Sequence, residues 1–199
     1  MSLDANEKPQ LKPSKELEFV NNLRTLKRAD LAVLKRNAGH TVAESRGAMG
    51  LFYRVLPQNM VGSMSEDIYF LVATLYPLNR QDHDGDFGAT MRAVKTLRGK
   101  TKENDSMDRR MNALLDSEFE SVSGAPFAGG EMAYRLRQAV KLAAAAGVGV
   151  NWQKLVEDLT FWSYPNRWAR KRWARSYYGD EIGKAESKPQ KKEETSGAY

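Results

Sequence analysis

The amino-acid sequence predicts an all-α protein built from two small helical bundles that are joined by a short linker. Three observations predict this class. In every long segment the apolar residues recur at intervals of three or four, which is the spacing of a helix face. Residues that favour helix ends flank these segments. A polar stretch without apolar residues, GKTKEND at positions 99–105, separates an N-terminal bundle (15–100) from a C-terminal bundle (101–180).

The composition allows a sizeable hydrophobic core and lacks the residue that thiol chemistry requires. Of its 199 residues 41% are hydrophobic, and four are tryptophan. The absence of cysteine excludes disulfides, zinc-thiolate sites and thiol catalysis. We find no apolar run long enough to span a membrane and no leader pattern, so we expect a cytoplasmic protein. The net charge of +6 weakly favours a polyanionic partner.

The N-terminal half is predicted to begin with a flexible arm and a helical segment. Residues 1–14 are polar and contain two prolines, which predicts the arm. Apolar residues then follow helical spacing from Lys15 to the sequence Asn-Ala-Gly at 37–39, a typical helix end.

Two core helices are predicted next. Thr41 and Glu44 have the spacing of a capping box, which predicts a helix start there, and Pro57 closes that helix. Ser65 is a suitable cap for the following helix, and Pro77 ends it.

The loop NRQDHDGDFG at positions 79–88 resembles a calcium-binding loop only superficially. Its aspartates alternate, but the required glycine is one position early and Ala93 occupies the place of the bidentate glutamate. The tripeptide DFG within it lacks the other kinase motifs. We interpret the loop as a turn that leads into another helix.

The C-terminal half is predicted to contain four helices and an unstructured tail. Ser106 precedes the first, a connection rich in Gly, Ser and Pro covers 121–130, and the second helix opens at Glu131. Asn151 caps the third helix. Pro165 ends it and starts the fourth, which stops at Gly179. The Lys-, Glu- and Ser-rich residues 181–199 are predicted to be a disordered tail.

The last helix combines an apolar face with a basic one. Ala169, Trp173 and Tyr177 follow each other at intervals of four and should face the core. The basic residues with the same spacing on the opposite side are Arg167, Lys171 and Arg175, and Arg170 and Arg172 lie between them. Such a face usually has an anionic partner. It could equally be a solvated face that Glu157 or Asp158 partly neutralises, and the helix alone leaves both interpretations open.

The sequence contains no recognisable catalytic, metal-binding or cofactor-binding motif. His40 and His83 are the only histidines, and both lie in predicted turns. No phosphate-binding P-loop and no dinucleotide-binding glycine motif can be found. We therefore expect a protein that is not an enzyme, although a metal-dependent nuclease assembled across the fold remains an alternative.

The order of the predicted elements resembles the CasB family, the small subunit of the type I-E CRISPR Cascade surveillance complex. The resemblance covers about residues 15–179, and its most specific parts are the RRMNALL helix and the stretch from Asn151 to Tyr177. The segments that carry it are LKRADLAVLKRNAG, LFYRVLP, EDIYFLVATLYPL, GDFGATMRAVKTL, SMDRRMNALLDS, EMAYRLRQAVKLAAAAGVGVNWQKLVEDLTFW and NRWARKRWARSYYG.

The resemblance implies a noncatalytic subunit that takes part in antiviral defence. Such a protein lies as a dimer along the complex, contacts the backbone and large subunits, and sits near the crRNA and the target DNA. Its basic surface steadies the R-loop, especially the displaced strand. The family's basic positions correspond here to Arg36, Arg109, Arg110, Arg135, Arg137, Arg167 and Arg170.

Together with Lys171 and Arg175 from the helix pattern, these arginines form the predicted nucleic-acid-binding set. Charge reversal at Arg167 and Arg170 should then weaken DNA binding and change stability by no more than about 1 kcal/mol, as expected of surface sites. Trp168 could stack on a base or pack against the protein. A helical adaptor that binds only proteins remains the alternative function.

Overall fold

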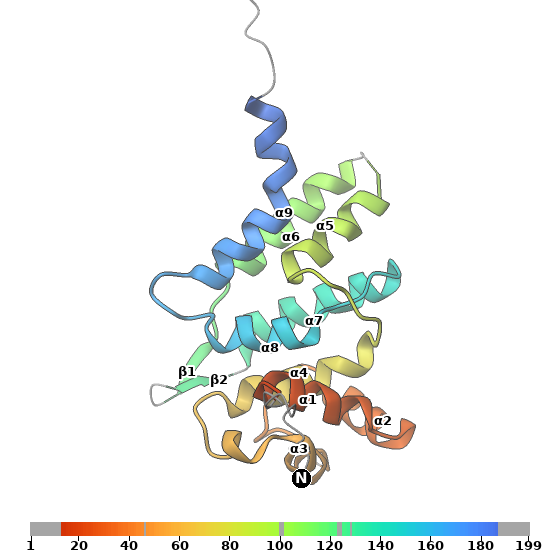
Figure 1. Ribbon diagram of the computed structural model, residues 1–199, viewed down its shortest axis with the longest axis vertical. Coiled ribbons are helices and arrows are strands. Elements are labelled where there is room, and N and C mark those ends of the chain that lie inside the picture. The colour runs from red at the N-terminus through yellow and green to blue at the C-terminus, as the bar shows by residue number, and fades with distance from the viewer. Residues whose placement is uncertain (1–12, 46, 100–101, 123–124, 128, 187–199) are drawn as a thin grey trace, which may run out of the picture.

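A computed structural model describes residues 13–45, 47–99, 102–122, 125–127 and 129–186, and these are mostly helical (Figure 1). The all-α prediction is confirmed. One small antiparallel hairpin accompanies the helices: β1 (Glu120–Val122) pairs with β2 (Ala125–Phe127). We expected only an irregular connection there, which was wrong, because strands of three residues are too short to show an alternating pattern.

The N-terminal helices are shorter than the sequence suggested. Their bounds are α1 (Lys15–Arg24), α2 (Arg28–Arg36), α3 (Met49–Val55), η1 (Gln58–Met60), α4 (Glu66–Leu75) and η2 (Tyr76–Leu78). The first predicted helical segment is interrupted between α1 and α2, where the Thr25 hydroxyl donates a hydrogen bond to the Asn22 carbonyl at 2.7 Å. Such side-chain bonds compete with continuation of a helix.

The capping pair forms as predicted but closes a turn. The Thr41 amide donates to Glu44 Oε2 at 3.0 Å, and the Glu44 amide donates to Thr41 Oγ1 at 3.3 Å. The helix nevertheless starts only at Met49. Gly47 has a φ of 81°, a left-handed conformation that a helix cannot continue through. The expected helix start at Thr41 was therefore wrong.

The remaining helices are α5 (Phe87–Leu97), α6 (Lys102–Asp116), α7 (Gly130–Ala145), α8 (Trp152–Thr160) and α9 (Trp168–Glu186). The predicted cap of α8 is confirmed, since the Asn151 side chain accepts a hydrogen bond from the Lys154 amide at 3.0 Å. The polar residues 102–105, which we assigned to a linker, are part of α6. The first apolar residue of this helix is Met107, so its first turn carries no apolar signal.

Both ends of α9 differ from the prediction. Pro165 lies in a turn, and Arg167, with a φ of 51°, directly precedes the helix. Gly179 does not end α9, because the helix continues to Glu186. A glycine inside a helix costs only about 1 kcal/mol relative to alanine. Residues 181–186 of the predicted disordered tail are thus helical, while 187–199 and residues 1–12 of the predicted arm lie outside the described residues.

The buried side chains of all the main helices form one core. Figure 1 shows α5, α6 and α9 together at one end, α1 to α4 at the other, and α7 and α8 between them. Helix α8 packs on α1 and α4, and α5 packs mainly on α9. The division into two bundles at residue 100 stays a prediction. No helix in the described part of the chain is long and apolar enough to cross a bilayer.

Candidate nucleic-acid interface

The apolar face of α9 fixes how its basic face is presented. Ala169, Trp173 and Tyr177 are buried, as predicted from their spacing. The Trp173 ring lies 4.7 Å from that of Trp162 and 5.0 Å from that of Phe87. The Trp173 ring is thus held between α5 and the turn that follows α8, which fixes the rotation of α9 and turns its opposite side toward solvent.

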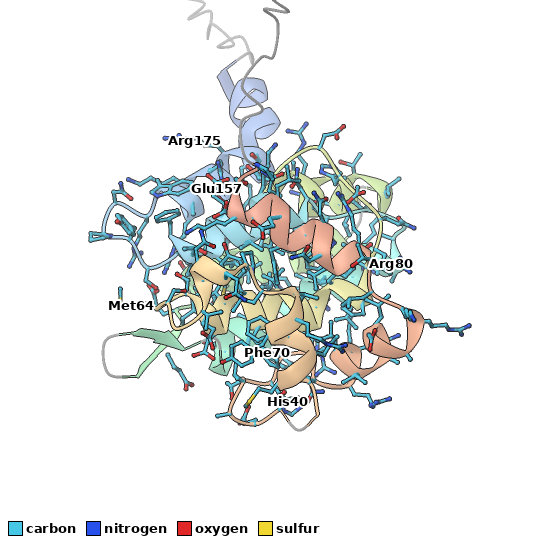
Figure 2. The ribbon with its side chains drawn as sticks, turned by 60° about the horizontal axis from the view of Figure 1, so that its bottom comes forward. His40, Met64, Phe70, Arg80, Glu157 and Arg175 are labelled. Atoms are coloured by element: carbon cyan, nitrogen blue, oxygen red, sulfur yellow. The ribbon has the colours of Figure 1, made fainter. Side chains whose placement is uncertain are left out.

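Lys171 and Arg175 are the exposed cations of that opposite side. They are one helical turn apart, about 6 Å along the axis. Among the residues that the structure describes, neither makes an ion pair or a hydrogen bond through its side chain. Arg175 lies on α9 at the outside of the molecule, well separated from Met64 and His40 (Figure 2). Within the described part of the chain, no carboxylate therefore competes with an outside anion for these two cations.

Arg167 lies one turn before Lys171 in the predicted basic row, but a nearby carboxylate partly compensates its charge. Its side chain is 61% exposed, and its guanidinium lies 3.8 Å from a Glu118 carboxylate oxygen. An ion pair of this length at the surface contributes little and does not withdraw the cation from solvent.

Arg170 is an internal residue, contrary to the expectation of a surface cation. Only 5% of it is exposed. Its guanidinium donates to the carbonyl oxygens of Trp162, at 3.3 Å, and Leu115, at 3.2 Å. It also pairs with Glu118 and lies 4.9 Å from the Trp162 ring centre. Its hydrogen-bonding capacity is used inside the protein, so we remove it from the candidate interface.

Arg172 is also paired inside the molecule. It bonds to the carboxylate of Asp158, which is fully buried and also accepts a hydrogen bond from Trp173 Nε1 at 2.7 Å. The Arg172 guanidinium lies 4.8 Å from the Trp168 ring, which is itself 5.7 Å from Phe161. The interpretation in which Asp158 neutralises part of the basic helix is correct for this arginine. Trp168 packs on protein groups.

A second group of predicted residues surrounds a surface hollow between α5, α6 and α7. Arg110 and Arg135 both line it, together with Tyr134 and Gln138, which the sequence reading did not single out. The sequence signal that could have identified Tyr134 is an aromatic residue that falls outside the buried apolar stripe of α7. Arg109, on the same helix as Arg110, is exposed.

The third group lies at the end of α2. Arg36 is exposed, and the stem of Arg137 packs against the turn that follows, where a Cβ built on Gly39 would meet Arg137 Cδ at 3.3 Å. The predicted residues are therefore distributed over α9, the hollow and the α2 end. Across the described residues, no group of three or more His, Asp or Glu side chains could hold a metal ion.

Comparison with known proteins identifies the family. The family model for the CRISPR-associated protein Cse2 matches residues 30–178, well over half of the chain. The chain belongs to the Cse2 family. The predicted family resemblance is thereby confirmed.

Individual Cse2 and CasB proteins are similar to this chain in sequence and fold. A CRISPR-associated protein Cse2 of Thermus thermophilus is 34% identical over 122 residues, which are 61% of this chain and 62% of that protein. The chain thus matches less than two thirds of the length of this curated relative.

Two solved structures share the fold. The crystal structure of M. ruber CasB matches with a TM-score of 0.66 and 24% identity, covering 88% of this chain and 98% of that one. A chain in a structure described as a CRISPR RNA-guided surveillance complex matches with a TM-score of 0.66 and 16% identity, covering 87% and 98%. At these identities the matches show the common fold alone.

Proposed function

We propose that this Cse2-family protein is the noncatalytic small subunit of a type I-E CRISPR RNA-guided surveillance complex, where it binds nucleic-acid backbone and stabilises the R-loop. Its partners would be a second copy of itself, the backbone and large subunits, the crRNA and the target DNA with its displaced strand. Family membership and the fold shared with a chain of such a complex support the assembly. The exposed cations Lys171 and Arg175, unpaired within the described part of the chain and held on a rigid helix, carry the nucleic-acid part of the proposal.

The mechanism is electrostatic. Lys and Arg side chains displace counterions from phosphates, so the binding is independent of base sequence and falls with salt, by a log-log slope of about 0.7 per neutralised phosphate on single strands. Nonspecific dissociation constants of about 10⁻⁴ to 10⁻⁶ M are weak. They become sufficient when neighbouring subunits hold the protein beside the DNA and raise its effective concentration.

Modest contacts of this kind can change the outcome of target recognition. The RNA–DNA heteroduplex is about as stable as the DNA duplex that it replaces, so R-loop formation is nearly balanced. Holding the displaced strand on Lys171 and Arg175 shifts this balance toward the open state. No bond is made or broken by the subunit.

The test is the double variant Lys171→Glu with Arg175→Glu, assayed for single-stranded DNA binding at several salt concentrations. Loss of two phosphate contacts should lower the log-log salt slope by about 1.4 and weaken binding at low salt. The control is Arg54→Glu with Arg80→Glu, which makes the same charge change at exposed residues outside the predicted set. Arg80 lies on a different part of the surface from Arg175 (Figure 2). Equal losses in both double variants would mean that net charge alone, and not this helix, determines binding.

A helical adaptor function has one observation in its favour. Met49, Tyr53, Val61 and Met64 are 43%, 38%, 50% and 73% exposed around α3 and η1, although all are large apolar or aromatic residues. Glu66 accepts hydrogen bonds from the Tyr53 hydroxyl and the Gly62 amide, which joins α3 to the turn after η1. An adaptor predicts that Val61→Ser with Met64→Ser reduces co-purification with other subunits, while the Lys171 and Arg175 double variant leaves DNA affinity unchanged.

A further inference from the structure

The hollow between α5, α6 and α7 has an apolar floor and a polar rim that contains no carboxylate among the described residues. Its volume is about 260 Å³, slightly below the range of about 300 to 1,000 Å³ for sites that hold drug-sized ligands. Buried Met91, Met111 and Leu114 form the floor. The rim consists of Arg110, Tyr134, Arg135 and Gln138. A space of this size suits one small planar group, and the cationic rim suits an anionic ligand.

The Tyr134 side chain is exposed and is not part of the hydrophobic core. It is 62% exposed, whereas the core of α7 is formed by neighbours such as Met132, Ala133 and Leu136. Within the described residues no other aromatic ring packs on it. An aromatic ring held in water beside an apolar cavity offers a free face for stacking.

Arg135 adds a partly exposed cation to the rim. Its Nε is buried, with no hydrogen-bond partner in the described part of the chain. The opposite end of the guanidinium is held by Glu131 one turn earlier on α7. The side chain as a whole is 34% exposed, so a phosphate at the rim can reach the guanidinium group, whereas the buried Nε is out of a ligand's reach.

We propose that this hollow receives one unstacked base of a single-stranded nucleic acid. Tyr134 stacks on the base, and the guanidinium groups of Arg110 and Arg135 at the rim contact the adjoining backbone. The site is tolerant of sequence, because every base has a face that can stack. This inference rests on the proposed nucleic-acid function and specifies its ligand: an open single strand and not a duplex, in which the bases are already stacked.

The experiment compares two oligonucleotides of equal length and charge, one a normal single strand and one built entirely of abasic sugar-phosphate units. Both are titrated against the full chain at low salt. Tyr134→Ala should weaken binding of the normal strand about 5- to 150-fold and change binding of the abasic strand less than about 2-fold. Tyr134→Phe, which keeps the ring, should bind both strands as the unaltered protein does.

Tyr164→Ala is the matched control, since Tyr164 is 53% exposed but lies outside the hollow, in the turn before α9. The affinity of the Tyr164→Ala variant for both strands should equal that of the unaltered protein. Equal loss on both strands, or no loss, in Tyr134→Ala would overturn the site. If Tyr134→Ala instead impaired only co-purification with other subunits, the hollow would be a protein contact and the inference would also be wrong.

The two proposals fail in distinguishable ways. If single-strand binding depends on salt and on Lys171 and Arg175 but not on Tyr134, the base site is wrong and the proposed electrostatic function still holds. Absence of any single-strand binding by the unaltered protein at low salt would contradict both.

Discussion

The backbone of Gly88 on α5 lies against the carbonyl of Trp173 on α9, and a Cβ built on Gly88 would stand 2.1 Å from the Trp173 oxygen. This approach is far closer than any side chain allows. Helix α5 therefore reaches α9 only because residue 88 has no side chain, and the contact holds the helix that carries Lys171 and Arg175. The close contact between Gly88 and Trp173 therefore helps to fix the orientation of the basic face of α9.

Gly88→Ala should destabilise the protein by about 3 kcal/mol, the upper part of the range for overpacked cores, because a backbone atom and not a flexible side chain must move. Chemical denaturation would measure this loss. Gly50→Ala on α3 is the control, as a Cβ there meets nothing within 4 Å. It should be neutral or stabilise by up to about 1 kcal/mol. Equal stability of the two variants would mean that α5 and α9 do not pack this closely in solution.

Arg170→Ala should lower the free energy of unfolding by about 2 to 4 kcal/mol. The change removes the donors for the carbonyl oxygens of Trp162, which is buried, and Leu115, which is partly buried, and it removes one of the two arginines that pair with Glu118. Arg175→Ala, on the exposed side of the same helix, should change stability by less than about 0.5 kcal/mol.

Urea denaturation of the two alanine variants separates an internal arginine from a surface one. Similar stabilities would restore Arg170 to the candidate interface. For the same reason, the expectation that charge reversal at Arg167 and Arg170 leaves stability unchanged is withdrawn, and Lys171 with Arg175 is the better pair for testing DNA binding.

Glu44 gives the stability a pH dependence of known sign. The hydrogen bonds from the Thr41 backbone amide and hydroxyl hold the pKa of the Glu44 carboxyl below its usual value. A lowered folded-state pKa contributes stability above the unfolded-state pKa, about 4.3, and the contribution disappears as the pH falls through the folded-state pKa. Glu44→Gln should therefore be less stable than the unaltered protein at pH 7, and the difference should shrink below about pH 4. Thermal melts across this range would show it, and a difference independent of pH would contradict the Thr41 bonds as its cause.

Much of the fold could be predicted because it is encoded in local spacing. The stripe of Ala169, Trp173 and Tyr177 and the Asn151 cap are relations within two helical turns, and the structure confirms them. Helix ends were less predictable. Pro165 and Gly179 are strong local signals for a helix start and a helix end. Helix α9 nevertheless begins only after Pro165, which lies in a hydrogen-bonded turn, and it continues through Gly179, because a helix tolerates a single glycine.

The sequence by itself determined that the chain is helical, that its aromatic residues form a core, and that its surplus charge is positive and has no catalytic motif beside it. Only the tertiary structure decided which cations are available. Arg170 and Arg172 have the same sequence neighbourhood as Lys171, but Glu118 and Asp158 reach them across the fold. The hollow that joins Arg110 to Tyr134 likewise depends on how α6 and α7 meet. Periodicity reports which side of a helix is buried, whereas pairing and cavities arise between segments far apart in the chain, and a single sequence carries no local signal for them.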